Sequence, residues 1–187
     1  MKNFKFMLSV LIVALLASVS PAGAGMIGYT IEAKAFFPDV TGPTTGGPIV
    51  KVVGGGVEFL NGDFGAFFGP SFDFANTTIT ITHAASAHQA GAFNGYRFND
   101  ILGTLPGFTG FSVLSDNTGF FSGDASRLFF DADNLWINFQ NLDFAANADA
   151  NIVLSVTTGQ AVPDPGATLL LFGMGLAGLG AFRRRRG

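Results

Sequence analysis

Residues 27–37, with the sequence IGYTIEAKAFF, indicate the fold class of this chain. Apolar side chains occupy every second position, and Thr30, Glu32 and Lys34 lie between them. Successive side chains of an extended strand point to opposite faces, so this period of two predicts a β-strand with one buried face.

The same alternation recurs downstream, between turns rich in glycine, proline and asparagine. These patterns predict about nine or ten strands, drawn from residues 27–37, 49–53, 57–60, 71–75, 77–82, 93–98, 111–114, 120–121, 127–130, 135–140 and 151–157. Residues 39–48 are predicted as a loop, and residues 84–92 allow one short helical turn. The domain is therefore expected to be all-β, a β-sandwich of jelly-roll type in preference to a barrel.

The composition supports a strand-rich domain with a core of phenylalanine. The chain has 22 Phe against 2 Tyr and 1 Trp, and it has 26 Gly. Aromatic residues favour strands, and glycine favours turns. Cysteine is absent, which excludes disulfides, thiol nucleophiles and cysteine-bound zinc. A domain spanning residues 25–161 is large enough to fold on a hydrophobic core alone.

The net charge of −3 is unevenly distributed, because residues 25–161 are strongly acidic and the two ends of the chain are basic. Residues 25–161 contain four Lys or Arg and twelve Asp or Glu, and 4 − 12 gives a net charge of −8 for this part. Nucleic-acid binding needs clustered Lys and Arg, so the sequence predicts no nucleic-acid partner.

Residues 1–24 have the three parts of a secretory signal peptide. Lys2 and Lys5 form the basic start, residues 7–19 form the apolar helix, and Ala22 and Ala24 form the A-x-A site for signal peptidase. The apolar run is shorter than the roughly 20 residues of a membrane span. We therefore expect cleavage after Ala24, with Ala22 as the alternative.

Residues 162–187 form a separate tail. Its apolar part, residues 166–182, would span about 25 Å as a helix, which predicts a transmembrane helix that anchors weakly. The arginines that follow predict a cytoplasmic C-terminus. The tail thus consists of a short motif (Val162, Pro163, Asp164 and Pro165), an apolar helix and an arginine cluster (Arg183, Arg184, Arg185 and Arg186).

This order of motif, helix and arginine cluster resembles the PEP-CTERM sorting signal of Gram-negative bacteria that make exopolysaccharide. The resemblance implies that an exosortase-type enzyme recognises the motif and cuts near it. It also implies an intermediate tethered to the inner membrane, which is then passed to the cell envelope, the cell surface or the extracellular matrix. Asp164 departs from the usual Glu, and its carboxylate is one methylene shorter, which predicts slower cutting or none.

Asp131, Asp133 and Asn134 form the strongest candidate for a metal site. Two carboxylates and an amide close together suit a hard cation such as calcium, although Trp136 occupies the position at which an EF-hand loop needs glycine. The alternative is a hairpin turn, in which Asp and Asn bind the backbone. We favour the turn and expect no metal and no cofactor.

His83 and His88 are the only histidines. Their spacing places them on opposite faces of a strand and far apart around a helix, so we expect a solvated loop rather than shared metal ligation. The motifs of a nucleophile elbow and of a phosphate loop are missing from the sequence, and we expect no catalytic residues.

The sequence thus predicts an exported, non-catalytic protein of the envelope or of the exopolysaccharide (biofilm) matrix, sorted by an exosortase-type system. A carbohydrate-binding β-sandwich is the second hypothesis. Trp136 alternates with Leu135, Ile137 and Phe139, so if those three form core, Trp136 would be exposed and would stack on a sugar. A secreted hydrolase is the third hypothesis. The expected partners are the exosortase, signal peptidase, extracellular polysaccharide and, before processing, the membrane.

Overall fold

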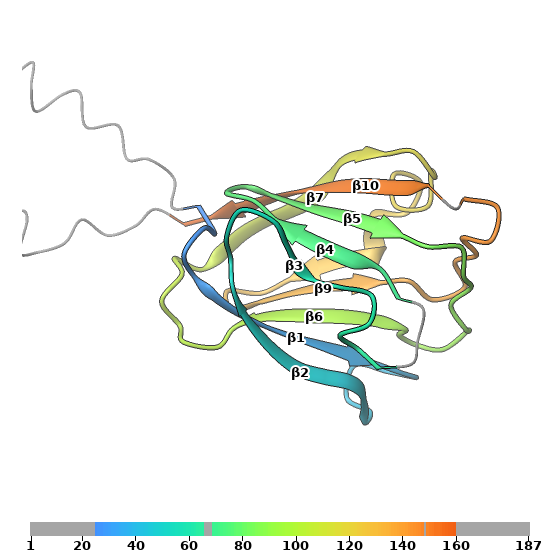
Figure 1. The fold of residues 1–187 in the computed structure, drawn as a ribbon, viewed down its shortest axis with the longest axis horizontal. Coiled ribbons are helices and arrows are strands. Elements are labelled where there is room, and N and C mark those ends of the chain that lie inside the picture. The colour runs from blue at the N-terminus through green and yellow to red at the C-terminus, as the bar shows by residue number, and fades with distance from the viewer. Residues whose placement is uncertain (1–24, 66–68, 148, 160–187) are drawn as a thin grey trace, which may run out of the picture.

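Ten strands form two antiparallel sheets in the part of the chain that the computed structural model describes, residues 25–65, 69–147 and 149–159 (Figure 1). One sheet has the strand order β2-β1-β6-β9-β8, and the other has the order β3-β4-β5-β10-β7. The prediction of an all-β fold is confirmed. The strands are β1 (Thr30–Phe36), β2 (Thr44–Val52), β3 (Val57–Phe59), β4 (Ser71–Phe74), β5 (Thr78–His83), β6 (Gly95–Asp100), β7 (Phe108–Asp116), β8 (Leu128–Phe130), β9 (Asn134–Asn138) and β10 (Ala150–Thr158).

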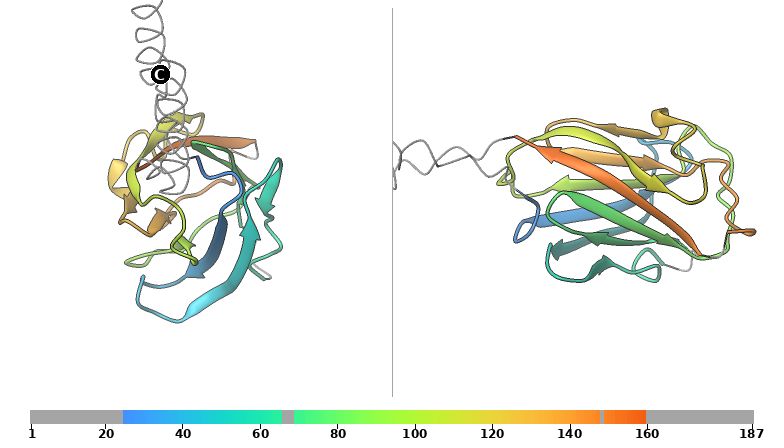
Figure 2. Two further views of the ribbon diagram at one scale, coloured as in Figure 1. Left: turned by 90° about the vertical axis from the view of Figure 1, so that its left-hand side faces the viewer. Right: turned by 90° about the horizontal axis from the view of Figure 1, so that it is seen from above.

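The chain passes repeatedly from one sheet to the other. Hairpins join β1 to β2, β3 to β4, β4 to β5, and β8 to β9, whereas the connections after β2, β5, β6, β7 and β9 cross between the sheets. Figure 2 shows the two layers from one end and from above, with the last strand, β10, lying between β5 and β7. The jelly-roll type of connection stays a prediction.

Phenylalanine rings from both sheets interlock in the core. Phe98 on β6 contacts Phe72 and Phe74 on β4 of the facing sheet, with ring centroids 4.7 and 5.0 Å apart and ring planes inclined by 70° and 67°. Such edge-to-face contacts stabilise each pair by about 0.5–1.5 kcal/mol beyond the burial of its area. Further fully buried rings among the described residues are Phe59, Phe64, Phe121, Phe139 and Phe144.

The first and last described residues lie at the same end of the sandwich, on the left in Figure 1. The Met26 amide donates to Asn76 O at 2.9 Å, and the Gly159 amide donates to Gly107 O at 2.8 Å. The opposite end carries the loops between β5 and β6, between β7 and β8, and between β9 and β10. The fold therefore has one end for the entry and exit of the chain and one end made of loops.

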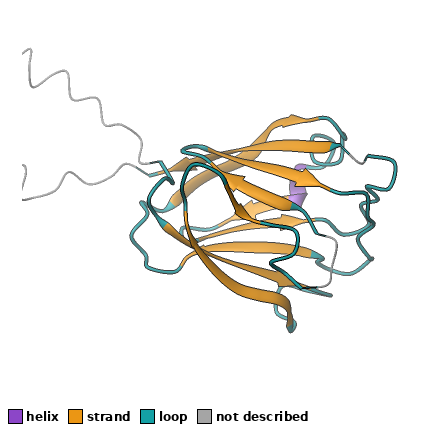
Figure 3. Ribbon diagram, in the orientation of Figure 1, coloured by secondary structure: helices purple, strands orange, loops and turns teal. Residues whose placement is uncertain are grey.

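Several local predictions were wrong. Residues 44–48 belong to β2 rather than to a loop, because β2 is an edge strand and a bulge in its pairing with β1 accommodates Gly46, Gly47 and Pro48. Residues 120–121 lie in a loop instead of a strand, and residues 84–92 contain no helix. Within the described residues the one helical element is the 3₁₀ turn η1 (Ala125–Arg127), shown in purple in Figure 3.

No helix within residues 25–65, 69–147 and 149–159 is long and apolar enough to cross a membrane. The predicted signal helix and the predicted transmembrane helix of the tail both lie outside the described residues.

We expect Phe98→Ala to lower the free energy of unfolding by about 3–5 kcal/mol, because it removes a fully buried ring from between the sheets. Phe130→Ala is the matched control, since the Phe130 side chain is 41% exposed and its loss should change stability by about 0.5 kcal/mol or less. Chemical unfolding of the full chain, followed by circular dichroism, measures both variants. If Phe98→Ala and Phe130→Ala lowered the free energy of unfolding by the same amount, the core contacts of Phe98 between the sheets would be contradicted.

Candidate functional site

The outer face of the sheet that contains β1, β6, β9 and β8 carries a row of four side chains, one from each strand. Cross-strand pairing joins Lys34 to Arg97, Arg97 to Trp136, and Trp136 to Phe129. We call these four residues the outer row. The alternation along each strand places them opposite the core, because neighbours such as Ala33, Phe98 and Leu135 are fully buried.

Glu32 pairs with both cations of the outer row. Its Oε1 lies 2.9 Å from Lys34 Nζ and 3.1 Å from Arg97 Nη2, and the Glu32 side chain is 9% exposed. The guanidinium of Arg97 also lies 5.5 Å from the centroid of the Phe36 ring. A carboxylate this buried needs such partners, because an unpaired buried charge is strongly destabilising. The charged half of the row is therefore engaged within the fold.

Trp136 forms the aromatic half of the outer row together with Phe129. It lies on the face opposite Leu135, Ile137 and Phe139, which are fully buried. The indole is half-buried and stacks on Phe129, with centroids 5.3 Å apart and planes 13° apart. The Phe129 side chain is 37% exposed. A ligand at this position would meet a stacked pair of rings rather than an isolated indole.

Asp131, Asp133 and Asn134 form the turn of the β8–β9 hairpin. Asp131 Oδ1 accepts hydrogen bonds from the backbone nitrogens of Asp133 and Asn134, both at 2.8 Å, and from Asn134 Nδ2 at 2.9 Å. The carboxylate considered above as a calcium ligand thus binds the backbone of its own turn. Across the described residues, no three or more His, Asp or Glu side chains gather closely enough to hold a metal ion.

His83 and His88 lie together at the loop end of the sandwich, so the prediction of a solvated loop was wrong. Their Nε2 atoms are 2.7 Å apart, His83 has no exposed surface, and His88 is half-buried. The spacing argument assumed a regular strand or helix, whereas residues 84–94 form an irregular loop that folds back onto β5. One feature of the sequence could have predicted the burial of His83. It continues the alternation of Ile79 and Ile81, which places His83 on the buried face of its strand.

Two phenyl rings enclose the histidine pair. His83 stacks on Phe144 with centroids 3.9 Å apart and planes 5° apart, and His88 stacks on Phe139 with centroids 5.0 Å apart and planes 26° apart. Burial lowers the pKa of His83. Burial, together with the neighbouring His83, lowers the pKa of His88 to about 4. Both imidazoles are therefore neutral at neutral pH.

His88 also faces a pocket of about 260 Å³ at this end of the fold. Phe36, Phe37 and Tyr96 contribute apolar surface to its wall, and Asn94 contributes a polar side chain. Burial raises the pKa of Tyr96, which is therefore a neutral phenol at ordinary pH.

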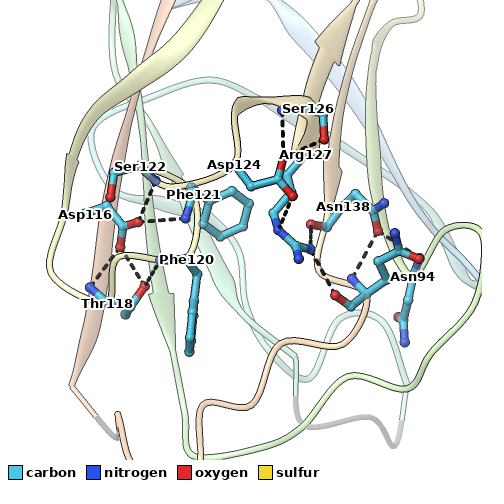
Figure 4. Close-up of polar contacts among 11 residues, drawn as sticks. Asn94, Asp116, Thr118, Phe120, Phe121, Ser122, Asp124, Ser126, Arg127 and Asn138 are labelled. Atoms are coloured by element: carbon cyan, nitrogen blue, oxygen red, sulfur yellow. Dashed lines mark hydrogen bonds and ion pairs between the residues drawn. The ribbon is translucent and has the colours of Figure 1, made fainter.

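The carboxylate of Asp116 accepts several hydrogen bonds within the loop that follows β7 and so holds this loop closed (Figure 4). Asp116 Oδ1 accepts hydrogen bonds from Thr118 Oγ1 at 2.6 Å and from Thr118 N at 2.9 Å. Asp116 Oδ2 accepts from Phe121 N at 2.8 Å and from Ser122 N at 3.1 Å. These bonds satisfy backbone groups that the loop would otherwise leave unpaired.

The closed loop holds two rings against the walls of the histidine pair. Phe120 packs edge-on against Phe144, with centroids 5.0 Å apart, and Phe121 packs edge-on against Phe139, with centroids 5.3 Å apart. Asp116 thus supports, through Phe120 and Phe121, the rings on which the histidines stack.

Arg127 anchors the other side of the same end (Figure 4). Its Nη1 donates to Gln140 O at 2.9 Å and to Asn138 O at 3.4 Å, and Asn138 Oδ1 accepts from Asn94 N at 3.2 Å. These contacts join the segment that carries Phe139 to the loop that carries His88.

The tail of the chain matches a known protein-family model. Residues 161–186 match the family model of the VPDSG-CTERM motif, an exosortase-type sorting signal akin to PEP-CTERM. The fold and the tail together define a sorting-domain protein with an all-β domain. The signal implies processing by an exosortase-type enzyme, export, and association with the cell envelope.

The match changes one detail of the resemblance noted in the sequence. The signal is VPDSG-CTERM rather than PEP-CTERM itself, so Asp164 agrees with the Asp of the motif, while Pro165 takes the place of its Ser. Asp164 is therefore no departure from the signal that this tail matches.

Comparison with curated proteins and with solved structures gave no significant match. The predicted sorting motif, the arginine cluster and the predicted cleavage sites at Ala22 and Ala24 lie outside the described residues.

We expect Asp116→Asn to lower the free energy of unfolding by about 1–3 kcal/mol at pH 7, because a neutral amide replaces a charged acceptor. Burial opposes the charged form of Asp116, but hydrogen bonds from the Thr118 side chain and from the amides of Ser122, Phe121 and Thr118 outweigh it. The pKa of Asp116 therefore lies below its ordinary value of 3.8. A carboxyl group with a lowered pKa stabilises the fold above its unfolded pKa, and this contribution disappears as the pH falls through the folded pKa.

Chemical unfolding at a series of pH values from 7 down to about 3 tests this expectation. The difference in stability between the wild type and Asp116→Asn should be constant near neutral pH and should shrink below about pH 4. Asp133→Asn, at an exposed turn position, is the control, and its free energy of unfolding should equal that of the wild type at each pH. A difference that stays the same at every pH would show that the charge of Asp116 has no part in holding the loop.

Proposed function

We propose that this chain is an exported, non-catalytic structural protein of the cell envelope or exopolysaccharide matrix, delivered there by an exosortase-type system. The observation that carries the proposal is the sorting signal at residues 161–186, which begins two residues after the last described residue of the β-domain. The proposal includes a Gram-negative host and an intermediate tethered to the inner membrane. It also includes final placement in the envelope, at the cell surface or in a biofilm matrix.

The arrangement of the two ends of the sandwich supports this proposal. The described chain begins and ends at one end of the sandwich, while the loops between β5 and β6, between β7 and β8, and between β9 and β10 lie at the other end. In a chain tethered by its tail, the loops that contain His88, Phe120 and Phe144 would thus be at the end of the domain farthest from its last described residue.

The use of the carboxylates supports a structural rather than a catalytic role. A catalytic acid or base needs a carboxyl group directed at a substrate. Here, eight carboxylates accept hydrogen bonds from backbone amides of the described loops and strands instead. They are Asp39, Glu58, Asp63, Asp100, Asp116, Asp124, Asp131 and Asp143.

The intact mass of the protein recovered from its native host tests the sorting. We expect a mass that lacks residues 1–24 and everything after about Pro165, because signal peptidase and an exosortase remove the two ends. In a strain without the exosortase, the mass should include Arg183 to Arg186. An Asp164→Ala variant in the wild-type host should give the same larger mass.

A tail that remains in the presence of an active exosortase would contradict the sorting proposal. The domain would then be a membrane-tethered module whose partner should be sought at the envelope.

A carbohydrate-binding module is the second candidate function, and the aromatic half of the outer row favours it. Trp136 and Phe129 lie side by side on a sheet face, and the Phe129 side chain is 37% exposed. Aromatic rings with exposed surface and a polar edge are suited to stack on sugars. Asn99 and Asn134, on the neighbouring strands β6 and β9, add hydrogen-bonding groups to the same face.

Affinity electrophoresis through gels that contain the host's polysaccharide tests the second candidate. If the ring pair binds sugar, Trp136→Ala and Phe129→Ala should each lose the retardation of the wild type, because each removes one ring of the stack. Leu114→Ala, which removes an apolar side chain that is 64% exposed on β7 of the other sheet, is the control and should be retarded like the wild type. Retardation of Trp136→Ala equal to that of the wild type would remove this candidate.

A further inference from the structure

The hydrogen bonds around His83 and His88 require more hydrogens than two neutral imidazoles contain. His83 Nδ1 lies 2.6 Å from Ala84 O, the two Nε2 atoms lie 2.7 Å apart, and His88 Nδ1 lies 3.4 Å from Asn94 Oδ1. The oxygens at both ends of this chain of contacts only accept, so each of the three contacts needs one ring hydrogen. Two neutral imidazoles supply one hydrogen each, and one contact is left without any.

The orientation of Asn94 is set by a separate contact. Asn94 Nδ2 donates to Gln89 O at 3.1 Å, which leaves its carbonyl oxygen facing His88 Nδ1. Both histidines therefore have a carbonyl oxygen beside Nδ1, and this favours the hydrogen on Nδ1 in each ring. The two Nε2 lone pairs then face each other, and a cation between them would remove the repulsion.

The same arrangement is what a metal ion requires of histidine ligands. Metal-bound histidines are neutral, bind through one ring nitrogen, and donate the hydrogen of the other nitrogen to a carbonyl or carboxylate oxygen. Ala84 O and Asn94 Oδ1 occupy those outer positions here. Stacking on Phe144 and Phe139 fixes the plane of each ring, so the two Nε2 atoms stay directed at each other.

We propose that His83 and His88 are the two protein ligands of a site for a late first-row divalent cation, copper(II) or zinc(II), which lies between their Nε2 atoms. Imidazole suits these ions, whereas calcium and magnesium prefer oxygen ligands. Copper(II) binds nitrogen ligands more tightly than zinc(II) in the general order of affinities, so we expect the two histidines to bind copper(II) more tightly than zinc(II).

Binding requires a small opening of the pair. Two nitrogens at about 2.0–2.1 Å from a tetrahedral ion are about 3.3 Å apart, which exceeds the separation of 2.7 Å by about 0.6 Å. His83 is held in β5, whereas His88 lies in the irregular loop before β6, and its movement can supply the difference. Because His88 faces the pocket described above, the ion and the water molecules that complete its coordination have a route to the site.

Metal titration of the untagged full chain, purified in mild detergent and freed of metal by a chelator, tests the proposal. Calorimetry with copper(II) chloride and, separately, with zinc(II) chloride should give one ion per chain, with copper bound more tightly. In ¹⁵N spectra of the histidine rings, the two Nε2 resonances should move on addition of zinc while both Nδ1 atoms keep their hydrogens. Calcium chloride should have no effect on these resonances.

Four variants separate this site from adventitious binding. His88→Gln and His83→Gln should abolish binding, and Asn94→Ala should weaken it about tenfold or more, since it removes the acceptor behind His88. The double variant Asp131→Asn, Asp133→Asn should bind like the wild type. Thermal melts without metal establish that each variant folds, and because His88 is half-buried in a loop, His88→Gln serves if His83→Gln does not fold.

Absence of copper and zinc binding in the wild type would overturn the proposal, and so would undiminished binding by folded His88→Gln. A wild type that binds neither ion, but whose two rings share a single added proton on acidification, would identify a buried proton site instead.

Discussion

The insertion of Phe98 between Phe72 and Phe74 of the opposite sheet is the contact on which the rest of the structure depends. Two sheets that pack face to face are held at a separation set by the side chains between them. Here those side chains are mainly phenyl rings in edge-to-face contact, which fill the space without polar groups that would need partners. Once this spacing is established, the outer row is directed to solvent and His83 is enclosed at one end.

The acidity of the domain has a structural explanation. A sandwich whose chain crosses repeatedly between sheets has many loops, and loops leave backbone amides without partners unless side chains accept from them. Aspartate is well suited to this role, because its short side chain reaches amides a few residues ahead, as Asp116 and Asp131 do. The negative charge therefore reflects how the loops are closed, and it also disfavours anionic partners such as nucleic acid.

The two regions of chemical interest lie in different parts of the fold. The outer row is on a sheet face, where both of its cations pair with Glu32 and its two aromatic rings, Trp136 and Phe129, stack on each other. The histidine pair is at the loop end, and the rings that enclose it are supported by the loop that Asp116 closes. The proposed metal site and the sorting signal thus belong to different segments of the chain.

The sequence by itself determined the all-β class, most of the strands and the sorting character of the tail, because each depends on neighbouring residues: a period of two, a turn residue, or an ordered motif. It placed Trp136 on the outer face for the same reason, since Leu135 and Ile137 beside it belong to the core. Only the tertiary structure decided that Trp136 stacks on Phe129, that residues 120–121 form a loop, and that His83 meets His88. These contacts join different strands or bring an irregular loop back onto a strand, so their distances depend on sheet packing and loop closure, which no local periodicity encodes.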